Sequence, residues 1–296
     1  MSPRAPAGAA RHAGRLVLGA ALAAALVALV VVIARGRAEQ PARCAAGMVA
    51  LGPRCCGEGQ RLEAGRCTGR PRRCASALRQ DDTGCVAPEQ RAFIAGGTLR
   101  VGPGDWEAQG VVPRREVAIA PFVLDAFEID ERRYGACVAA GACGAVPFSG
   151  EPSRAVAGVT ADDAARFCAW AGGRLPTRDE LGWAAAGPAS RRYAWGDTGA
   201  VCRRAAWGLK TGPCGEGAVG PEVVGSHPDG VSPDGVYDLA GNVAEWTQPE
   251  PGSTTAEARG GSWADGEAAA LRSWNRRELD RATRSPEIGF RCAYSG

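Results

Sequence analysis

The cysteines of this 296-residue chain constrain its fold more than any other feature. There are twelve, and all of them follow residue 43. A high and even count of cysteines is typical of proteins that fold in an oxidising compartment and are held by disulfides. Structural zinc is the alternative, but the chain has only His12 and His227 and no Cys-x-x-Cys pair. We therefore expect disulfides throughout the part of the chain that carries the cysteines.

An uncharged apolar stretch, LVLGAALAAALVALVVVIA, runs from Leu16 to Ala34. A helix needs about 20 such residues to cross the hydrocarbon layer of a membrane. A cleaved signal peptide is the alternative, because Gly36 and Ala38 form a small-x-small pattern. We expect a retained transmembrane helix, or signal anchor, at 16–34, after a cytoplasmic tail at 1–15. Since every cysteine follows the span, the chain is predicted to be a single-pass membrane protein whose C-terminal domain is extracytoplasmic, either periplasmic or extracellular.

Residues 35–90 are expected to form a small disulfide-rich linker module. Six of the cysteines lie in this segment among glycine, proline and arginine, with few large apolar side chains. A segment of this size cannot build a sufficient hydrophobic core and needs covalent crosslinks. The sequence leaves the pairing of these six cysteines open, and a spacer is the simplest role for the module.

The charge pattern gives no indication of nucleic-acid binding. The formal net charge is only +3, and the basic residues are almost all arginine, with Lys210 the single lysine. No run of five or more basic residues occurs, whereas nucleic-acid-binding domains cluster such residues on one face.

The C-terminal part of the chain carries the patterns of a mixed α and β domain. Runs such as FIAGGTLRVG and REVAIAPFVLDAFEID partly alternate apolar and polar residues, as strands do. Thr160 precedes a helical segment whose Phe167 and Trp170 have the spacing of core residues. Thr177 with Glu180 three residues later predicts the capped start of another helix.

Seven motifs follow one another in this part of the chain: FIAGGTLRVG, APFVLDAFEIDERRYGACV, DAARFCAWAGGRLPTRDELGWAAAG, YAWGD, GVYDLAGNVAEWT, RGGSW and GFRCA. Together they resemble the formylglycine-generating enzyme, or sulfatase-modifying factor, family over residues 91–296. Any one motif is weak, but the ordered set is specific. The resemblance implies a single α+β domain, a variant of the C-type-lectin fold with much irregular structure.

The resemblance also implies a calcium site in the segment DLAGNVAEW. The family's ligands correspond to the side chains of Asp238 and Glu245 and to the carbonyls of Gly241 and Val243. Calcium takes six to eight oxygen ligands, including backbone carbonyls, so the residue types suit a structural calcium ion. The alternative is a turn in which Glu245 caps backbone N–H groups.

The chain departs from the family at the two cysteines on which its oxidase chemistry depends. In family members both cysteines closely follow the RGGS motif and bind copper(I), but here Asp265 and Ala270 occupy those positions. A carboxylate or a methyl group does not replace a thiolate as a ligand for this soft metal, so copper is not expected. Iron bound by several histidines, which related domains use, is excluded as well, because His227 is the only histidine after the apolar stretch.

The six cysteines of the large domain are expected to leave no free thiol that could rescue this chemistry. Cys168 and Cys292 stand where the family places a disulfide between a helix and the last strand. Two further pairs, Cys137 with Cys143 and Cys202 with Cys214, are close enough in sequence to close short loops.

We therefore predict a noncatalytic binding or scaffold module with an unknown protein, peptide or glycan as its partner. Tryptophan and arginine dominate interface energetics, and the predicted binding cleft consists of Trp263, Asp265, Arg272, Trp274 and Arg276. Ordinary packing and surface charge are the alternative for each of these residues. An enzyme that uses the same cleft, with Asp265 or Glu267 as general acid or base, is the alternative function. An oxidase that works through a different thiol is a third.

Overall fold

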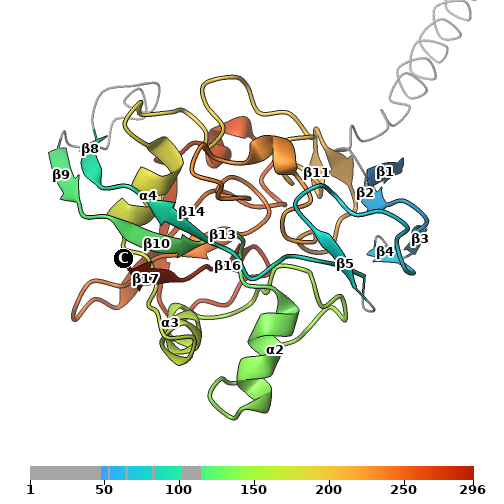
Figure 1. Ribbon diagram of the computed structural model, residues 1–296, viewed down its shortest axis with the longest axis horizontal. Coiled ribbons are helices and arrows are strands. Elements are labelled where there is room, and N and C mark those ends of the chain that lie inside the picture. Colours follow the sequence, from blue (N-terminus) through green and yellow to red (C-terminus); the bar gives the residue numbers. More distant parts are fainter. Residues whose placement is uncertain (1–47, 53, 64–65, 82–83, 102–114) are drawn as a thin grey trace, which may run out of the picture. The chain divides into compact units, whose positions relative to one another are not determined.

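The computed structural model of the chain describes residues 48–52, 54–63, 66–81, 84–101 and 115–296 (Figure 1). The chain divides into two units, Met1–Gln40 and Pro41–Gly296, and all described residues belong to the second. The predicted tail at 1–15 and the predicted membrane span at 16–34 lie outside the described residues. Within the described ranges, no helix has the length and apolar character needed to cross a membrane.

Short strands and a few helices, joined by long irregular segments, make up the described residues. The helices are α2 (Glu131–Ala139), α3 (Ala161–Trp170), α4 (Arg178–Ala186) and two 3-10 turns, η2 (Pro228–Gly230) and η3 (Ala268–Leu271). The strands before α2 are β1 (Met48–Leu51), β2 (Arg54–Gly57), β3 (Arg61–Glu63), β4 (Arg66–Thr68), β5 (Arg79–Asp81), β6 (Gly84–Val86), β7 (Arg91–Ile94), β8 (Gly97–Val101), β9 (Arg115–Ile119) and β10 (Phe122–Asp125). The strands after α4 are β11 (Thr211–Gly212), β12 (Gly215–Glu216), β13 (Ala244–Trp246), β14 (Thr255–Arg259), β15 (Arg276–Asp280), β16 (Ile288–Gly289) and β17 (Ala293–Ser295).

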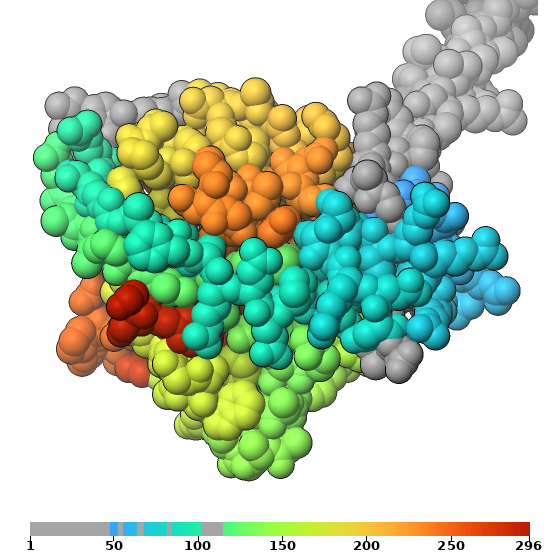
Figure 2. Space-filling view, viewed as in Figure 1, coloured from blue at the N-terminus to red at the C-terminus, as the bar shows by residue number. Residues whose placement is uncertain are grey.

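Two sheets organise the large domain. One has the strand order β17-β10-β7 and is antiparallel, so it joins the C-terminus to the start of the domain. Figure 2 shows the C-terminal residues, in dark red, at the surface beside segments coloured green and teal. The other sheet has the order β15-β14-β13-β16, in which only the β13–β16 pair is parallel. The remaining described strands form two-stranded hairpins.

Helix α3 begins where the sequence predicts, but one of its two predicted core residues is exposed. Thr160 caps the helix, and its hydroxyl accepts a hydrogen bond from the N–H of Asp163 at 3.0 Å. Phe167 is buried as expected, in a core with Tyr134 of α2 and Phe290. Trp170 in the last helical turn contacts the Phe167 ring but remains 45% exposed. The prediction that Trp170 is a core residue is therefore wrong.

The predicted capping of α4 is confirmed and is reinforced by an arginine. Thr177 accepts from the N–H of Glu180 at 3.1 Å, and the Glu180 carboxylate accepts from the N–H of Thr177 at 2.8 Å. Arg174 donates two hydrogen bonds of 2.6 Å to the same carboxylate. The hydrophobic face of α4, with Leu181 and Trp183, packs on the three-stranded sheet and on β8 and β9.

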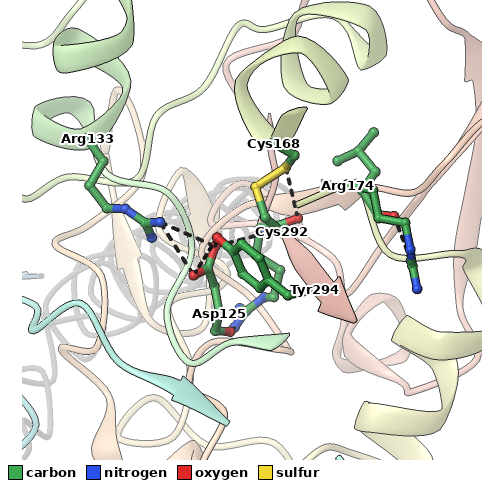
Figure 3. Close-up of a disulfide and its surroundings, with 8 residues drawn as sticks. Asp125, Arg133, Cys168, Arg174, Cys292 and Tyr294 are labelled. Atoms are coloured by element: carbon green, nitrogen blue, oxygen red, sulfur yellow. Dashed lines mark hydrogen bonds and ion pairs between the residues drawn. A yellow bond between two sulfur atoms is a disulfide. The ribbon is translucent and has the colours of Figure 1, made fainter. Parts of the chain in front are cut away.

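Four disulfides are resolved between described cysteines. They include Cys137–Cys143, Cys168–Cys292 and Cys202–Cys214, the three pairs expected for the large domain. Cys168–Cys292 joins α3 to the segment before β17, and both of its cysteines are fully buried (Figure 3). No cysteine in the described part of the chain has a free thiol.

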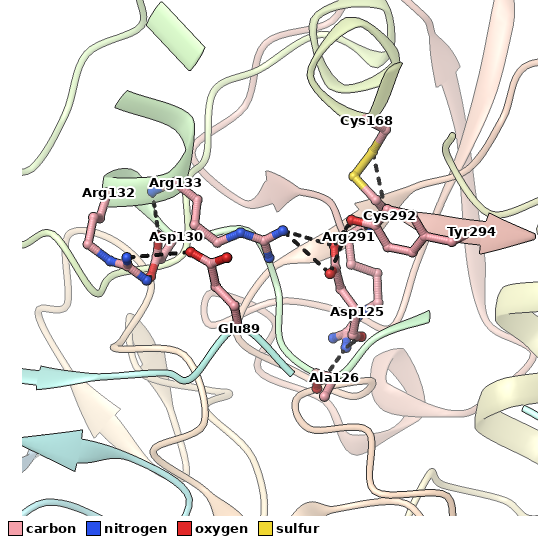
Figure 4. Close-up of polar contacts among 10 residues, drawn as sticks. All are labelled: Glu89, Asp125, Ala126, Asp130, Arg132, Arg133, Cys168, Arg291, Cys292 and Tyr294. Carbon is pink, nitrogen blue, oxygen red and sulfur yellow. Dashed lines mark hydrogen bonds and ion pairs between the residues drawn. A yellow bond between two sulfur atoms is a disulfide. The ribbon is translucent and has the colours of Figure 1, made fainter. Parts of the chain in front are cut away.

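The end of the predicted linker module packs on the large domain. The fourth disulfide, Cys74–Cys85, crosslinks this segment. Ala77, Leu78 and Ala87 contact a small core that contains Phe127 and Val224. Glu89 forms an ion pair of 3.7 Å with Arg132 of α2 (Figure 4). The segment from about residue 74 onward thus buries its few apolar side chains against the large domain.

Candidate functional site

The segment from Asp238 to Trp246, predicted as a calcium site, forms a tight buried turn that ends in β13. Three of its residues have left-handed backbone: Asp238 (φ 56°), Gly241 (φ 86°) and Asn242 (φ 57°). A Cβ atom at Gly241 would lie 2.6 Å from the carbonyl oxygen of Ala206, so only glycine fits there without displacement. Asp238, Asn242 and Glu245 are each at least 95% buried. Their polar groups must therefore be satisfied within the protein.

Glu245 is held by a fully buried arginine from the GFRCA motif. Arg291 donates to both oxygens of the Glu245 carboxylate at 2.7 Å, from Nε and from Nη2. Its remaining donors reach the carbonyl of Tyr237 at 2.7 Å and those of Asp125 and Ala126 at 3.1 and 3.2 Å. Figure 4 shows Arg291 beside Asp125 and Ala126. All guanidinium donors have acceptors, which offsets much of the cost of removing the charge from water.

Asn242 joins the same turn to two other segments. Its side-chain oxygen accepts from the N–H of Glu222 at 2.8 Å, and its amide nitrogen donates to Glu128 at 2.5 Å. Glu128 also accepts from the N–H of Val243 at 3.1 Å. Glu222 pairs with His227 at 2.8 Å. The left-handed backbone at Asn242 is thus held by hydrogen bonds to residues far away in the sequence.

Carboxylates outnumber cations in this buried region. Burial raises the pKa of Glu128 well above its usual value, and the negative charges of Asp238 and Glu245 raise it further. Burial also raises the pKa of Asp238 and of Glu245, in opposition to the attraction of Arg291. The Oδ2 atom of Asp238 accepts from the N–H of Gly225 at 2.5 Å.

The oxygen atoms of this turn suit calcium in type, but the Glu245 carboxylate is already engaged. A calcium ion bound by Glu245 would share that carboxylate with the guanidinium of Arg291. Among the residues that the structure describes, no three His, Cys, Asp or Glu side chains are grouped as a metal site. Calcium at Asp238, Gly241, Val243 and Glu245 thus stays a prediction.

Asp265 and Ala270, where the resemblance places the family's copper-binding cysteines, lie in the turn before η3 and within η3 itself. The Asp265 carboxylate accepts from both the N–H and the hydroxyl of Ser262, at 2.7 and 2.8 Å. The carbonyl of Ala270 accepts from the side chain of Asn275 at 2.9 Å. Glu267 is exposed. Asp265 therefore stabilises the turn. Glu267 faces solvent, whereas a general acid or base in an enclosed cleft would be buried.

The predicted binding cleft is brought together only in part. Trp263 is 3% exposed, donates to the carbonyl of Pro286 at 3.0 Å and packs among Trp207 and Leu271. Its indole packs in the core, and its assignment to a binding cleft stays a prediction. Trp274 and Arg276 line a cavity of about 290 Å³. The other described residues that line it are Ser273, beside Trp274, and residues of β8, β9, α4 and β14. Asp265 and Arg272 are not among them.

Sequence reasoning missed the residues that organise both regions. Glu128, Asn242 and Arg291 belong to the quoted motifs, but nothing in their local spacing indicates that they meet. Arg259 opens the RGGS motif and lines the cavity, so its place in the motif was a usable signal. Ser273, also in the cavity wall, carries no sequence signal.

Comparisons with known proteins agree with this geometry. The profile of the sulfatase-modifying factor enzyme 1-like domain matches residues 79–295. It begins inside the segment that we predicted as the linker module. Two curated relatives are similar in sequence, both named "Inactive C-alpha-formylglycine-generating enzyme 2". The protein from Mus musculus is 38% identical over 154 residues, and that from Bos taurus is 37% identical over 151 residues. Each match covers 46% of this chain and 48% of the relative, so the chain spans about half the length of these relatives.

Solved structures of the same fold exist. PvdO from Pseudomonas aeruginosa superposes with a TM-score of 0.58 at 20% identity, covering 70% of this chain and 94% of PvdO. The Treponema denticola variable protein 1 has a TM-score of 0.57 at 20% identity, covering 70% and 95% of the two chains. At this identity the likeness shows the fold alone. Since the family profile matches most of its length, the chain belongs to the sulfatase-modifying factor enzyme 1-like family, as a diverged member of the formylglycine-generating enzyme type.

Proposed function

We propose that this chain is a noncatalytic member of its family and acts as a binding or scaffold module. The observation that carries the proposal is the pair Asp265 and Ala270 at the family's two cysteine positions. The Asp265 carboxylate is bound by Ser262 within its own turn. The sequence relatives whose names describe them as inactive support the same reading.

The chemistry of copper(I) explains why these replacements abolish oxidation. Copper(I) is a soft ion that prefers thiolates, and a carboxylate is a hard ligand. No displaced thiol is at hand in the described residues, since every cysteine there forms a disulfide. The side chains of Asp265 and Ala270 therefore cannot bind copper(I), although Asp265 stabilises the backbone of its turn.

The test is to incubate the full-length protein with copper(I) and a cysteine peptide that active family members convert. We expect no formylglycine by mass spectrometry and no tightly bound copper. Alkylation of the unreduced, denatured protein should label no cysteine. Formylglycine on the peptide, or a labelled cysteine that also binds copper(I), would refute the proposal.

The proposed location is outside the cytoplasm, with the chain anchored in a membrane by residues 16–34. The resolved disulfides support this location, because such crosslinks persist in oxidising compartments. Alkaline extraction should leave the protein with the membrane pellet, and protease added outside spheroplasts or cells should degrade the domain. Recovery of the protein in the alkaline supernatant would argue for a cleaved segment instead.

Calcium at the Asp238 turn is a second proposal, supported by the excess of buried carboxylates around it. The carboxylates of Asp238 and Glu245 and the carbonyls of Gly241 and Val243 would hold the ion. A structural calcium ion would offset the negative charge of the two carboxylates. We expect a chelator to lower the melting temperature of the protein and expect Asp238→Ala to reduce that difference. Glu245 is the poorer choice for a variant, since its loss also leaves Arg291 unpaired. Identical melting curves with and without chelator would reject the site.

A further inference from the structure

The cavity that Trp274 and Arg276 line has walls of two kinds. Leu99, Val101, Ala186 and Trp274 supply apolar surface, and five arginines and two carboxylates supply charge. Its volume of about 290 Å³ lies near the lower end of the range for small-molecule sites, which is about 300–1,000 Å³. The space suits a ligand with one ring or a short chain rather than a large cofactor.

Positive charge predominates in the wall. The arginines are Arg100, Arg115, Arg178, Arg259 and Arg276, and the carboxylates are Asp179 and Glu257. Arg115 donates two hydrogen bonds to the Asp179 carboxylate. Glu116 and Glu250 pair with Arg100 and Arg178 from outside the wall. The side chains of Arg100, Glu116 and Glu250 are largely exposed, and that of Arg178 is 44% exposed. Pairs of that kind are screened by water and contribute little.

Arg259 and Arg276 stand directly opposite each other on the antiparallel strands β14 and β15. Like charges in this position repel and destabilise a sheet. Glu257 offsets the repulsion only in part. It lies 2.8 Å from Arg259, but 3.5 Å from Arg276 and 3.8 Å from Arg178. The guanidinium groups of Arg276 and Arg178 therefore make only long contacts and have donors that a further anion could engage.

Ser273 provides an independent indication of a ligand. The residue lines this cavity and a smaller neighbouring one, and it is 94% buried, as its exposed fraction is 6%. Its hydroxyl has no hydrogen-bond partner among the described residues. An unsatisfied buried hydroxyl costs free energy, and such a group in a cavity wall commonly marks the place of a missing partner.

We propose that this cavity binds a phosphate or sulfate ester, with its apolar body against Leu99, Val101 and Trp274. The guanidinium groups of Arg178 and Arg276 and the hydroxyl of Ser273 supply hydrogen-bond donors for three oxygen atoms. A phosphate or sulfate ester offers three such oxygens, whereas a carboxylate offers two. The inference deepens the proposed binding role and rests on it. The titration below does not involve copper or formylglycine, so failure of one proposal is distinguishable from failure of the other.

The test is calorimetric titration of the full-length protein with phenyl phosphate, 4-nitrophenyl sulfate and benzoate. We expect one or both esters to bind and benzoate to bind at least about tenfold more weakly. Arg276→Gln should weaken ester binding about tenfold or more, since it removes a charge-assisted donor. The matched control is Arg277→Gln. Arg277 is the next residue on β15, is equally exposed (33% against 35%) and pairs with Glu287 at 2.9 Å. This control should bind the esters like the parent protein.

Ser273→Ala separates binding from folding. The hydroxyl has no partner to lose, so the variant should keep the parent's melting temperature while its ester affinity falls several-fold. The proposal is overturned if neither ester binds, if Arg276→Gln and Ser273→Ala bind as tightly as the parent, or if benzoate binds as well as the esters. Failure of both esters to bind would leave the predicted absence of oxidase activity untouched.

Discussion

The disulfide between Cys168 and Cys292 should stabilise the domain more than the other crosslinks do. Its two cysteines are 124 residues apart, whereas Cys202 and Cys214 are 12 apart. In the loop-closure description, crosslinking removes from the unfolded chain an entropy that consists of a constant and a part that grows with the logarithm of the loop length. This relation gives about 5 kcal/mol at 25 °C for Cys168–Cys292 and about 3 kcal/mol for Cys202–Cys214.

The perturbation is the double variant Cys168→Ala/Cys292→Ala, with Cys202→Ala/Cys214→Ala as its control. Urea unfolding monitored by circular dichroism gives the free energy of unfolding for each protein. We expect the first variant to lose about 2 kcal/mol more than the control. In a domain of this size, a loss of about 5 kcal/mol corresponds to a fall in melting temperature of roughly 10–20 °C. The urea m-value should also rise more in the first variant, because its unfolded chain is freed from the longer constraint.

Two outcomes would refute this reasoning. If the control variant loses as much stability as the first, loop length does not determine the contribution of these disulfides. If stability falls but the m-value is unchanged, the loss comes from the folded state. In that case the buried position of both cysteines would be the better explanation.

Three further predictions concern the helix α4 and the buried turn. Thr177→Ala should cost about 1 kcal/mol of unfolding free energy, because it removes the N-cap acceptor of α4. Hydrogen bonds from its neighbours hold the pKa of Glu180 below its usual value although burial raises it. Its stabilisation is therefore full above the unfolded pKa of about 4.3 and is lost as the pH falls through the lower folded pKa. Glu180→Gln should accordingly be less stable than the parent at pH 7 in chemical denaturation, and the difference should shrink as the pH falls below the unfolded pKa of about 4.3. Gly241→Ala should cost about 2 kcal/mol or more, from left-handed backbone plus a clash. Gly235→Ala should cost less in thermal melts, since its φ of 79° is similar but a Cβ there meets nothing within 4 Å.

Local sequence signals predicted the local features well. Thr160 and Thr177 sit at helix starts because a hydroxyl followed three residues later by a carboxylate satisfies the free N–H groups of the first turn. The three expected disulfides of the large domain are present, and two of them close short loops that sequence spacing alone suggests. The mixture of helices and sheets also agrees with the expectation for this family.

Features that depend on long-range packing were not predictable in this way. Trp170 and Trp263 are both tryptophans within the quoted motifs, yet one is 45% and the other 3% exposed. Tertiary packing decides the difference, since Trp263 packs among Trp207 and Leu271 and donates to the carbonyl of Pro286, whereas Trp170 contacts the Phe167 ring at the surface. The pair Arg291 and Glu245 is separated by 46 residues, and no local pattern indicates which carboxylate a buried arginine will select.

The arrangement of these contacts explains how the fold is kept without its oxidase cysteines. The turn from Asp238 to Trp246 is held by Arg291, which pairs with Glu245 of the turn, and by Asn242, which bonds Glu222 and Glu128. None of these contacts involves position 265 or 270. At position 265 an aspartate can bond the N–H and hydroxyl of Ser262, so it closes its own turn with two hydrogen bonds. Replacement of a metal-binding cysteine by such a residue removes the soft ligand while adding a local constraint. An aspartate at position 265 is thus compatible with retention of the fold.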